Sequence, residues 1–167
     1  MATRQPRMSP TTTAIVGAIS DAVSDLETLK DELTDWYDGM PENLQGGSKG
    51  DALQEAVSEL DNVSEPSLSN EVTALLDTEG AKVEITYQRD RKATSRSARR
   101  YESVSMLDAA KEKLEMLVEE RRKVEAADTE NDMTAHTDIT DELEVLAGEL
   151  NDIADCANSV EFPGMMG

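Results

Sequence analysis

The sequence is short of the residues from which most catalytic and metal sites are built. It contains one cysteine, Cys156, and one histidine, His136, among 167 residues. A single cysteine excludes an internal disulfide framework and a cysteine-based zinc site. His136 lies in a polar stretch without a nucleophile or metal ligand at motif spacing, so we interpret it as a surface residue. Glu-x-x-His pairs and P-loop glycine spacing are also missing, and we expect no enzyme activity, no metal ion and no cofactor.

Aromatic residues make up only 3% of the chain, so the core must be aliphatic. No apolar run approaches the roughly 20 residues that a membrane-spanning helix needs. The basic N-terminal residues are not followed by a long hydrophobic stretch, and we therefore expect a cytoplasmic location without membrane contact. The length fits one domain with tails.

Negative charge is what the chain has in excess, with a net charge of −20 that is unevenly spread. Residues 1–80 carry 4 basic and 16 acidic side chains, residues 105–167 carry 5 and 17, and residues 81–104 between them carry 7 and 3. Two acidic arms thus flank a basic centre. Such an excess keeps a protein soluble and on average repels nucleic acid.

Apolar residues recur at heptad spacing in three segments, which predicts long amphipathic helices that bury their seams against other helices. Of these three long helices, the first is expected to start at Ser9-Pro10. The second is expected to start at a capping box formed by Ser105 and Asp108, and the last near Thr137. Shorter helices are expected over 51–63, capped by Ser48, and over 70–78. The seam positions of the first helix are Ile15, Ile19, Ala22, Leu26, Leu29, Leu33, Trp36 and Met40. Those of the second are Leu107, Ala110, Leu114, Leu117 and Val124, interrupted by Arg121, and those of the last are Ile139, Leu143, Leu146, Leu150, Ile153, Ala157 and Val160.

A strand pattern appears once, where Val83, Ile85 and Tyr87 alternate with polar residues. We expect a returning strand at 99–104, with basic residues at the tip of the ribbon between them. The predicted fold is therefore mainly α, an elongated helical bundle or coiled coil with a short β-ribbon insertion.

The predicted organisation has five parts in chain order. A flexible N-terminus (1–8) precedes an acidic helical hairpin (9–80) and a basic ribbon or loop (81–104). A second helical hairpin (105–160) and a flexible tail (161–167) follow. The seams could close within one chain or between copies, and an oligomer would use Leu26, Leu29, Leu33, Trp36, Leu143, Leu146, Leu150 and Ile153.

Rows of carboxylates on the first and last helices are the first candidate binding feature. Exposed acidic rows can imitate the phosphates of DNA and occupy the DNA-binding groove of another protein. Plain solvation of a coiled-coil surface and adaptation to high salt are the commoner explanations of such rows. The residues concerned are Asp31, Asp35, Asp38, Glu142 and Glu149.

The basic centre is the second candidate feature. Its cations could contact phosphates while tyrosines stack on bases, or they could pair with the acidic arms of the same chain or of a second copy. We favour the pairing, because the overall negative charge opposes the approach of nucleic acid. The residues are Arg89, Arg91, Lys92, Arg96, Arg99 and Arg100, with Tyr87 and Tyr101.

Residues 31–60, DELTDWYDGMPENLQGGSKGDALQEAVSEL, join a charged helix ending in an aromatic residue to a second amphipathic helix through a P-E-N-L-Q turn. This segment resembles one found in uncharacterised acidic helical proteins encoded by bacteriophages. The resemblance covers under a fifth of the chain. It implies an origin in a phage or mobile element and assigns no role to any residue.

Three functions are compatible with these features. The first is a protein-binding module, encoded by a phage, that inhibits or modulates a nucleic-acid-acting host protein through its acidic faces. The second is an oligomeric scaffolding component of a virion or another assembly. The third is a nucleic-acid accessory protein that uses the basic segment 89–100.

Overall fold

The computed structural model describes residues 8–78, 81–90 and 95–162. In chain order the elements are β1 (Met8–Ala14), α1 (Ile15–Asp38), α2 (Glu42–Gln45), α3 (Ser48–Leu60), α4 (Asn70–Leu76), β2 (Asp77–Thr78), β3 (Ala81–Lys82), β4 (Glu84–Asp90), α5 (Arg96–Ala127) and α6 (Thr134–Ser159). The protein is mainly α with a short antiparallel ribbon, which confirms the predicted fold class.

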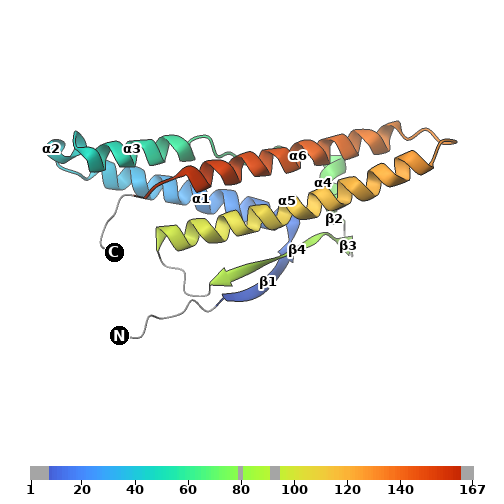
Figure 1. The fold of residues 1–167 in the computed structure, drawn as a ribbon, viewed down its shortest axis with the longest axis horizontal. Helices are drawn as coiled ribbons and strands as arrows, with labels where there is room; N and C mark the ends of the chain where they lie inside the picture. Colours follow the sequence, from blue (N-terminus) through green and yellow to red (C-terminus); the bar gives the residue numbers. More distant parts are fainter. Residues whose placement is uncertain (1–7, 79–80, 91–94, 163–167) are drawn as a thin grey trace.

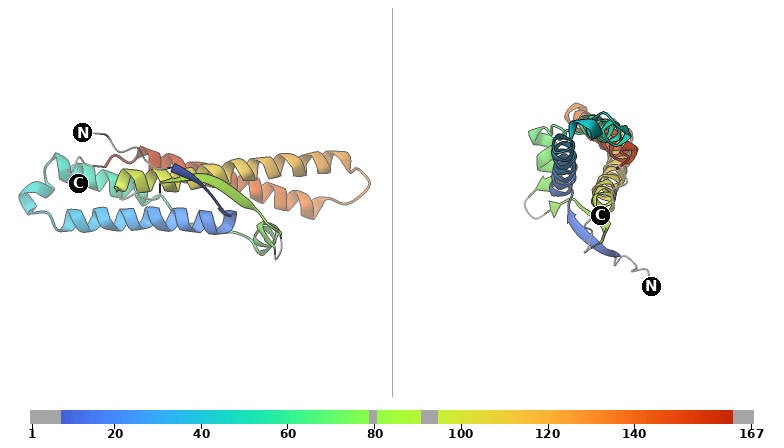
Figure 2. Two further views of the ribbon diagram at one scale, coloured as in Figure 1. Left: turned by 90° about the horizontal axis from the view of Figure 1, so that it is seen from below. Right: turned by 90° about the vertical axis from the view of Figure 1, so that its left-hand side faces the viewer.

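Two helical hairpins form an elongated bundle (Figure 1). α1 and α3 make the first hairpin, and the longer helices α5 and α6 make the second. α1 packs on α5, while α3 and α4 pack on α6. The connection between α5 and α6 projects beyond the start of α1 (Figure 2), so the far part of the second hairpin has fewer helices around it.

The predicted seams form the core of this bundle. Leu26, Leu29 and Leu33 of α1 are fully buried, as are Leu143 and Leu150 of α6. In α5 the seam is buried only through its first half, and Val124 near the end is exposed. Burial of each leucine removes apolar surface from water and contributes about 1.5–3 kcal/mol, which is the main force that joins the two hairpins.

The start of α1 differs from the prediction. Ser9 and Pro10 belong to β1, and the helix begins five residues after Pro10, at Ile15. Three consecutive threonines favour extended backbone because they are β-branched. Pro10 is tolerated because a two-stranded sheet has only edge strands. The backbone NH of Ile15 donates to the Val83 carbonyl at 2.8 Å, which fixes the point where strand becomes helix.

The returning strand predicted at 99–104 is also wrong, because these residues are helical. α5 begins at Arg96, and the Ser95 side chain caps it by accepting from the Ala98 NH. Ser105, the predicted start, therefore lies inside the helix. The partner of β4 is β1, with Thr11 opposite Tyr87. This pairing joins residues that are 70 or more positions apart in the chain, and no local periodicity can reveal it.

The turn between α2 and α3 depends on a glycine. A Cβ on Gly50 would lie 2.0 Å from the Gln45 carbonyl oxygen, so only glycine lets the two short helices approach this closely. Ser48 is the first residue of α3, yet its side chain makes no capping bond, and Gly47 occupies the N-cap. α6 begins at Thr134, three residues earlier than predicted.

Candidate protein-binding surface

The arginines at the start of α5 are directed into the protein. Arg99 donates from both terminal nitrogens to the two carboxylate oxygens of Glu32, at 3.1 and 2.7 Å. This bidentate contact lowers the pKa of Glu32 and raises that of Arg99, chiefly through the hydrogen bonds between them. The Arg96 guanidinium lies 5.3 Å from the centre of the Trp36 ring, and the Lys49 ammonium lies 5.8 Å from it.

Arg100 holds the C-terminal segment instead. It donates to the Val160 carbonyl, and its guanidinium lies 5.1 Å from the centre of the Phe162 ring. Together with Arg96 and Arg99 it ties the start of α5 to α1 and to the end of α6. Of these three cations, only Arg99 pairs with an acidic side chain, as we expected for the basic segment. Arg96 and Arg100 instead contact aromatic rings and a backbone carbonyl.

Of the remaining residues of the predicted basic site, Tyr87 lies in β4 and Tyr101 lies in α5. Tyr87 is only 8% exposed, so its ring is not open to a base, whereas Tyr101 is 60% exposed on α5. Arg89 lies in β4, opposite Ser9. Arg91 and Lys92, and the side chain of Arg89, lie outside the described residues.

The predicted acidic row on α1 lies at the surface. Asp31, Asp35 and Asp38 are all exposed and follow one another at steps of four and three residues, so they share one face of the helix. Within the described residues, none of the three carboxylates lies in an ion pair.

The two predicted acids of α6 are exposed as well, beside the segment that leads into α4. Glu142 accepts a hydrogen bond from the Ser69 hydroxyl at 2.5 Å. Glu149 borders two open hollows between α6 and residues 62–72, of about 240 and 340 Å³.

The residues predicted to form an oligomer seam pack against one another within a single chain. Leu26, Leu29, Leu33, Leu143, Leu146, Leu150 and Ile153 are buried, and Trp36 is partly buried against the same core. A second copy is therefore not needed to cover them.

A polar layer between α5 and α6 was missed by the prediction. Thr140 is fully buried, and its hydroxyl accepts from the Arg121 Nε at 2.9 Å. The same hydroxyl lies 2.8 Å from the Glu125 Oε1 and 2.8 Å from the His136 carbonyl, and can donate to either. Arg121 is desolvated here, which lowers its pKa. Its position in the heptad seam was the one signal of this layer in the sequence.

His136, which we predicted to be a surface residue, belongs to this layer. Its side chain is 25% exposed, and its Nδ1 lies 2.9 Å from the Glu125 Oε1. Burial raises the pKa of Glu125, but hydrogen bonds from Thr140, His136 and Arg122 together outweigh that effect and leave it lowered. The contact joins the start of α6 to α5.

Arg122 bridges the two helices on the outside of the hairpin. It donates to Asp141 at 2.5 Å and to Glu144 at 3.0 Å, both on α6, and to Glu125 on its own helix at 3.2 Å. These hydrogen bonds raise the pKa of the arginine. One cation is therefore shared among three carboxylates.

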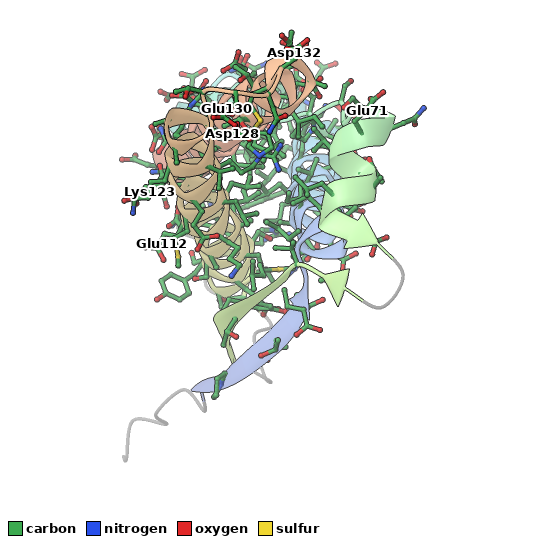
Figure 3. The ribbon with its side chains drawn as sticks, turned by 90° about the vertical axis from the view of Figure 1, so that its right-hand side faces the viewer. Glu71, Glu112, Lys123, Asp128, Glu130 and Asp132 are labelled. Carbon is green, nitrogen blue, oxygen red and sulfur yellow. The ribbon has the colours of Figure 1, made fainter. Side chains whose placement is uncertain are left out.

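The tip of the hairpin is acidic too, with Asp128, Glu130 and Asp132 close together (Figure 3). Asp128 accepts from the Asn131 backbone and side chain, and Asp132 accepts from the Thr134 backbone and hydroxyl. These bonds lower the pKa of both aspartates and close the connection between α5 and α6.

The described residues contain no group of three histidine, cysteine, aspartate or glutamate side chains placed to hold a metal ion. Cys156 is partly buried, which raises the pKa of its thiol and keeps it in the less nucleophilic protonated form. None of the helices in the described part of the chain has both the length and the apolar character needed to cross a membrane.

The chain was compared with protein-family models, with curated proteins and with solved structures, and none of them matches it.

Proposed function

We propose that this protein is a non-enzymatic binding module that recognises a basic protein through the carboxylates on its helices. The observation that supports this proposal is a difference between cations and carboxylates: most cations contact other residues of the chain, whereas a row of aspartates stays exposed. Most cations on the described helices contact other residues of the chain, among them Lys30 with Asp61, Arg99 with Glu32, and Arg122 with three acids. Asp31, Asp35 and Asp38 remain exposed on one rigid helix face.

In its sharper form, the proposal is that a phage-encoded protein inhibits or modulates a nucleic-acid-acting protein in the host cytoplasm. The three aspartates follow one another at about 6 and 4.5 Å along the helix axis, given the rise of an α-helix. Phosphates follow one another at about 3.4 Å along the axis on each DNA strand. The spacing of the three carboxylates is therefore of the same order as that of the phosphates. A basic protein surface that binds a row of phosphates could also bind this row of carboxylates.

The other two functions have less support. The seam leucines are buried within one chain, so assembly is not required to cover them. Arg96, Arg99 and Arg100 contact Trp36, Glu32 and the Val160 carbonyl, which leaves them poorly placed to hold phosphates.

The test is capture of partners from a bacterial extract on the immobilised protein. We expect a basic nucleic-acid enzyme to bind at low salt, to be released at high salt because the contact is ionic, and to be displaced by duplex DNA. The variant Asp31→Lys, Asp35→Lys, Asp38→Lys should lose this partner.

The matched control reverses three exposed acids elsewhere, as Glu112→Lys, Glu120→Lys and Glu130→Lys, and so makes the same change in net charge. It should retain the partner. Equal capture by both variants would show that the α1 face does not bind it, and failure of DNA to compete would refute the phosphate-like mode.

A further inference from the structure

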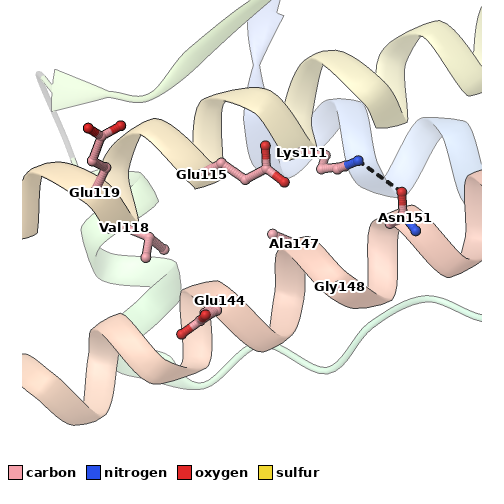
Figure 4. Close-up of a pocket in the computed structure, with 8 residues that line it drawn as sticks. All are labelled: Lys111, Glu115, Val118, Glu119, Glu144, Ala147, Gly148 and Asn151. Carbon is pink, nitrogen blue, oxygen red and sulfur yellow. Dashed lines mark hydrogen bonds between the residues drawn. The ribbon is translucent and has the colours of Figure 1, made fainter. Parts of the chain in front are cut away.

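The second hairpin has an open groove on one side, between α5 and α6. The groove has a volume of about 500 Å³ and is lined only by residues of these two helices. α1 and α4 pass behind the pair in Figure 4, so the groove opens away from the helices that cover the other side of the hairpin.

The floor of the groove is apolar and is formed by small side chains. Val118 of α5 and Ala147 and Gly148 of α6 lie there. At one end, the Lys111 ammonium donates to the Asn151 side chain at 2.9 Å and joins the two helices. Two helices that leave such a furrow between them present the surface on which a third helix packs in a bundle.

Gly148 has no evident role in the fold. Glycine in a helix interior costs about 1 kcal/mol relative to alanine. A Cβ at Gly148 would meet no atom within 4 Å, in contrast to Gly50, where it would overlap the Gln45 backbone. Gly17 is equally open, but it lies in the first turn of α1. Gly148 keeps the floor low at the place where an incoming helix would come closest.

The rim of the groove selects the charge of the occupant. Glu115, Glu119 and Glu144 line it. Glu119 pairs with Lys123 and Glu144 with Arg122, but no ion pair among the described residues includes Glu115. Since the whole chain carries −20, a second copy would be repelled and a cationic helix attracted.

We propose that this groove binds an amphipathic helix of a partner protein, with small or aliphatic side chains on the floor and lysine or arginine side chains against the rim. The inference rests on the proposed protein-binding function and gives it a second contact surface, separate from the aspartates of α1. Helix-in-groove recognition of this kind is read by apolar anchors spaced three and four residues apart.

The probe is a fluorescent synthetic helix of about five turns, with leucines along one face and lysines elsewhere, measured by anisotropy against the full chain. A peptide of the same composition with the leucines spread around the helix is its control. The test variant is Gly148→Leu, which fills the floor, and the matched variant is Gly17→Leu, which makes the same change at an open position outside the groove.

We expect wild type and Gly17→Leu to bind the amphipathic peptide, and Gly148→Leu to bind it at least about tenfold more weakly, because its side chain occupies the anchor position. The scrambled peptide should also bind at least about tenfold more weakly to wild type. The melting temperature of Gly148→Leu should not fall, since leucine favours helix over glycine.

Equal affinity of Gly148→Leu and wild type would overturn the groove proposal, as would equal binding of the two peptides or no binding at low salt. If the peptide instead binds through Asp31, Asp35 and Asp38, the variant in which all three are replaced by lysine will lose binding. Gly148→Leu will then bind the peptide as wild type does. In that case the proposed function would stand without the groove. A concentration-dependent dimer that Gly148→Leu dissociates would identify a second copy as the occupant and would also overturn the proposal.

Discussion

Arg99 and Glu32 lie 67 residues apart in the chain, and their side chains meet through two parallel hydrogen bonds of 3.1 and 2.7 Å. The contact joins the basic centre to the first acidic arm. It uses an arginine that would otherwise be open to phosphates, and it also fixes the start of α5 beside the second half of α1. The charge pattern along the chain thus contributes to tertiary structure as well as to surface potential.

Replacing Arg99 with alanine should lower the free energy of unfolding by about 1 kcal/mol, because the pair is bidentate yet partly exposed to water. Denaturant unfolding of Arg99→Ala, Glu32→Ala and the double variant would measure the coupling between the two side chains. Arg99→Lys should recover only part of the loss, since an ammonium cannot make both bonds. Additive single effects would mean that the two side chains are not coupled in solution.

Leu33 tests whether the seam closes inside the chain. Because its side chain is fully buried between helices, Leu33→Ala should lower the free energy of unfolding by about 2–5 kcal/mol. The molar mass from light scattering should not change before unfolding. Val124→Ala, an exposed position in α5, is the control and should have little effect. A fall in mass without loss of helix would point to an oligomeric seam instead.

Thr140 tests the polar layer. Thr140→Val keeps the shape but removes the hydroxyl that accepts from Arg121, so a partly buried guanidinium NH loses its partner. The expected loss of stability is about 1–3 kcal/mol. Thr140→Ser should restore most of it, because the hydroxyl returns. If valine and serine give the same stability, the hydrogen bonds of Thr140 contribute nothing net.

Acid should weaken the far end of the second hairpin. The pKa of Glu125 is lowered in the folded protein, so its contribution to stability is present above about pH 4.5 and is lost as the pH falls through the lowered pKa. The difference in unfolding free energy between wild type and Glu125→Gln should therefore be largest near neutral pH and shrink as the pH falls through the lowered pKa of Glu125.

Hydrogen bonds from Asn131 and Thr134 lower the pKa values of Asp128 and Asp132, and the two aspartates therefore add to this acid sensitivity. Hydrogen exchange of the α5–α6 connection, corrected for the intrinsic rate at each pH, would localise the effect. A difference between wild type and Glu125→Gln that stays constant with pH would show that Glu125 has the same pKa in the folded and unfolded chain.

The periodicity of apolar residues was sufficient to predict the three long helices and their buried faces. Leu26, Leu33, Leu143 and Leu150 were placed in seams by spacing alone, and all are buried. This succeeds because a helix has a fixed number of residues per turn, so one face can be read along the sequence. Less of the candidate binding surface could be predicted from the sequence. The aspartates of α1 were predicted at the surface and lie there, but the groove beside Gly148 was not predicted.

The errors occurred where one segment depends on a distant one. Local signals at Ser9-Pro10 favour a helix start, yet pairing with β4 makes the segment a strand. Residues 99–104 alternate like a strand, yet they are part of α5. The Ser95 side chain caps the start of this helix, and Arg99 donates to Glu32 of α1. His136 has no motif partner nearby in the sequence and gains Glu125 only when α6 folds back on α5.

The sequence by itself determined the class of this protein: an acidic, mainly α chain with aliphatic seams and few residues suited to catalysis, because composition and helical period are properties of neighbouring residues. Only the tertiary structure decided that the seams close within one chain, that Arg96, Arg99 and Arg100 serve internal contacts, and that a groove stays open between α5 and α6. Those outcomes depend on which helices pack together, and packing is set by the fit of surfaces that are remote in the chain.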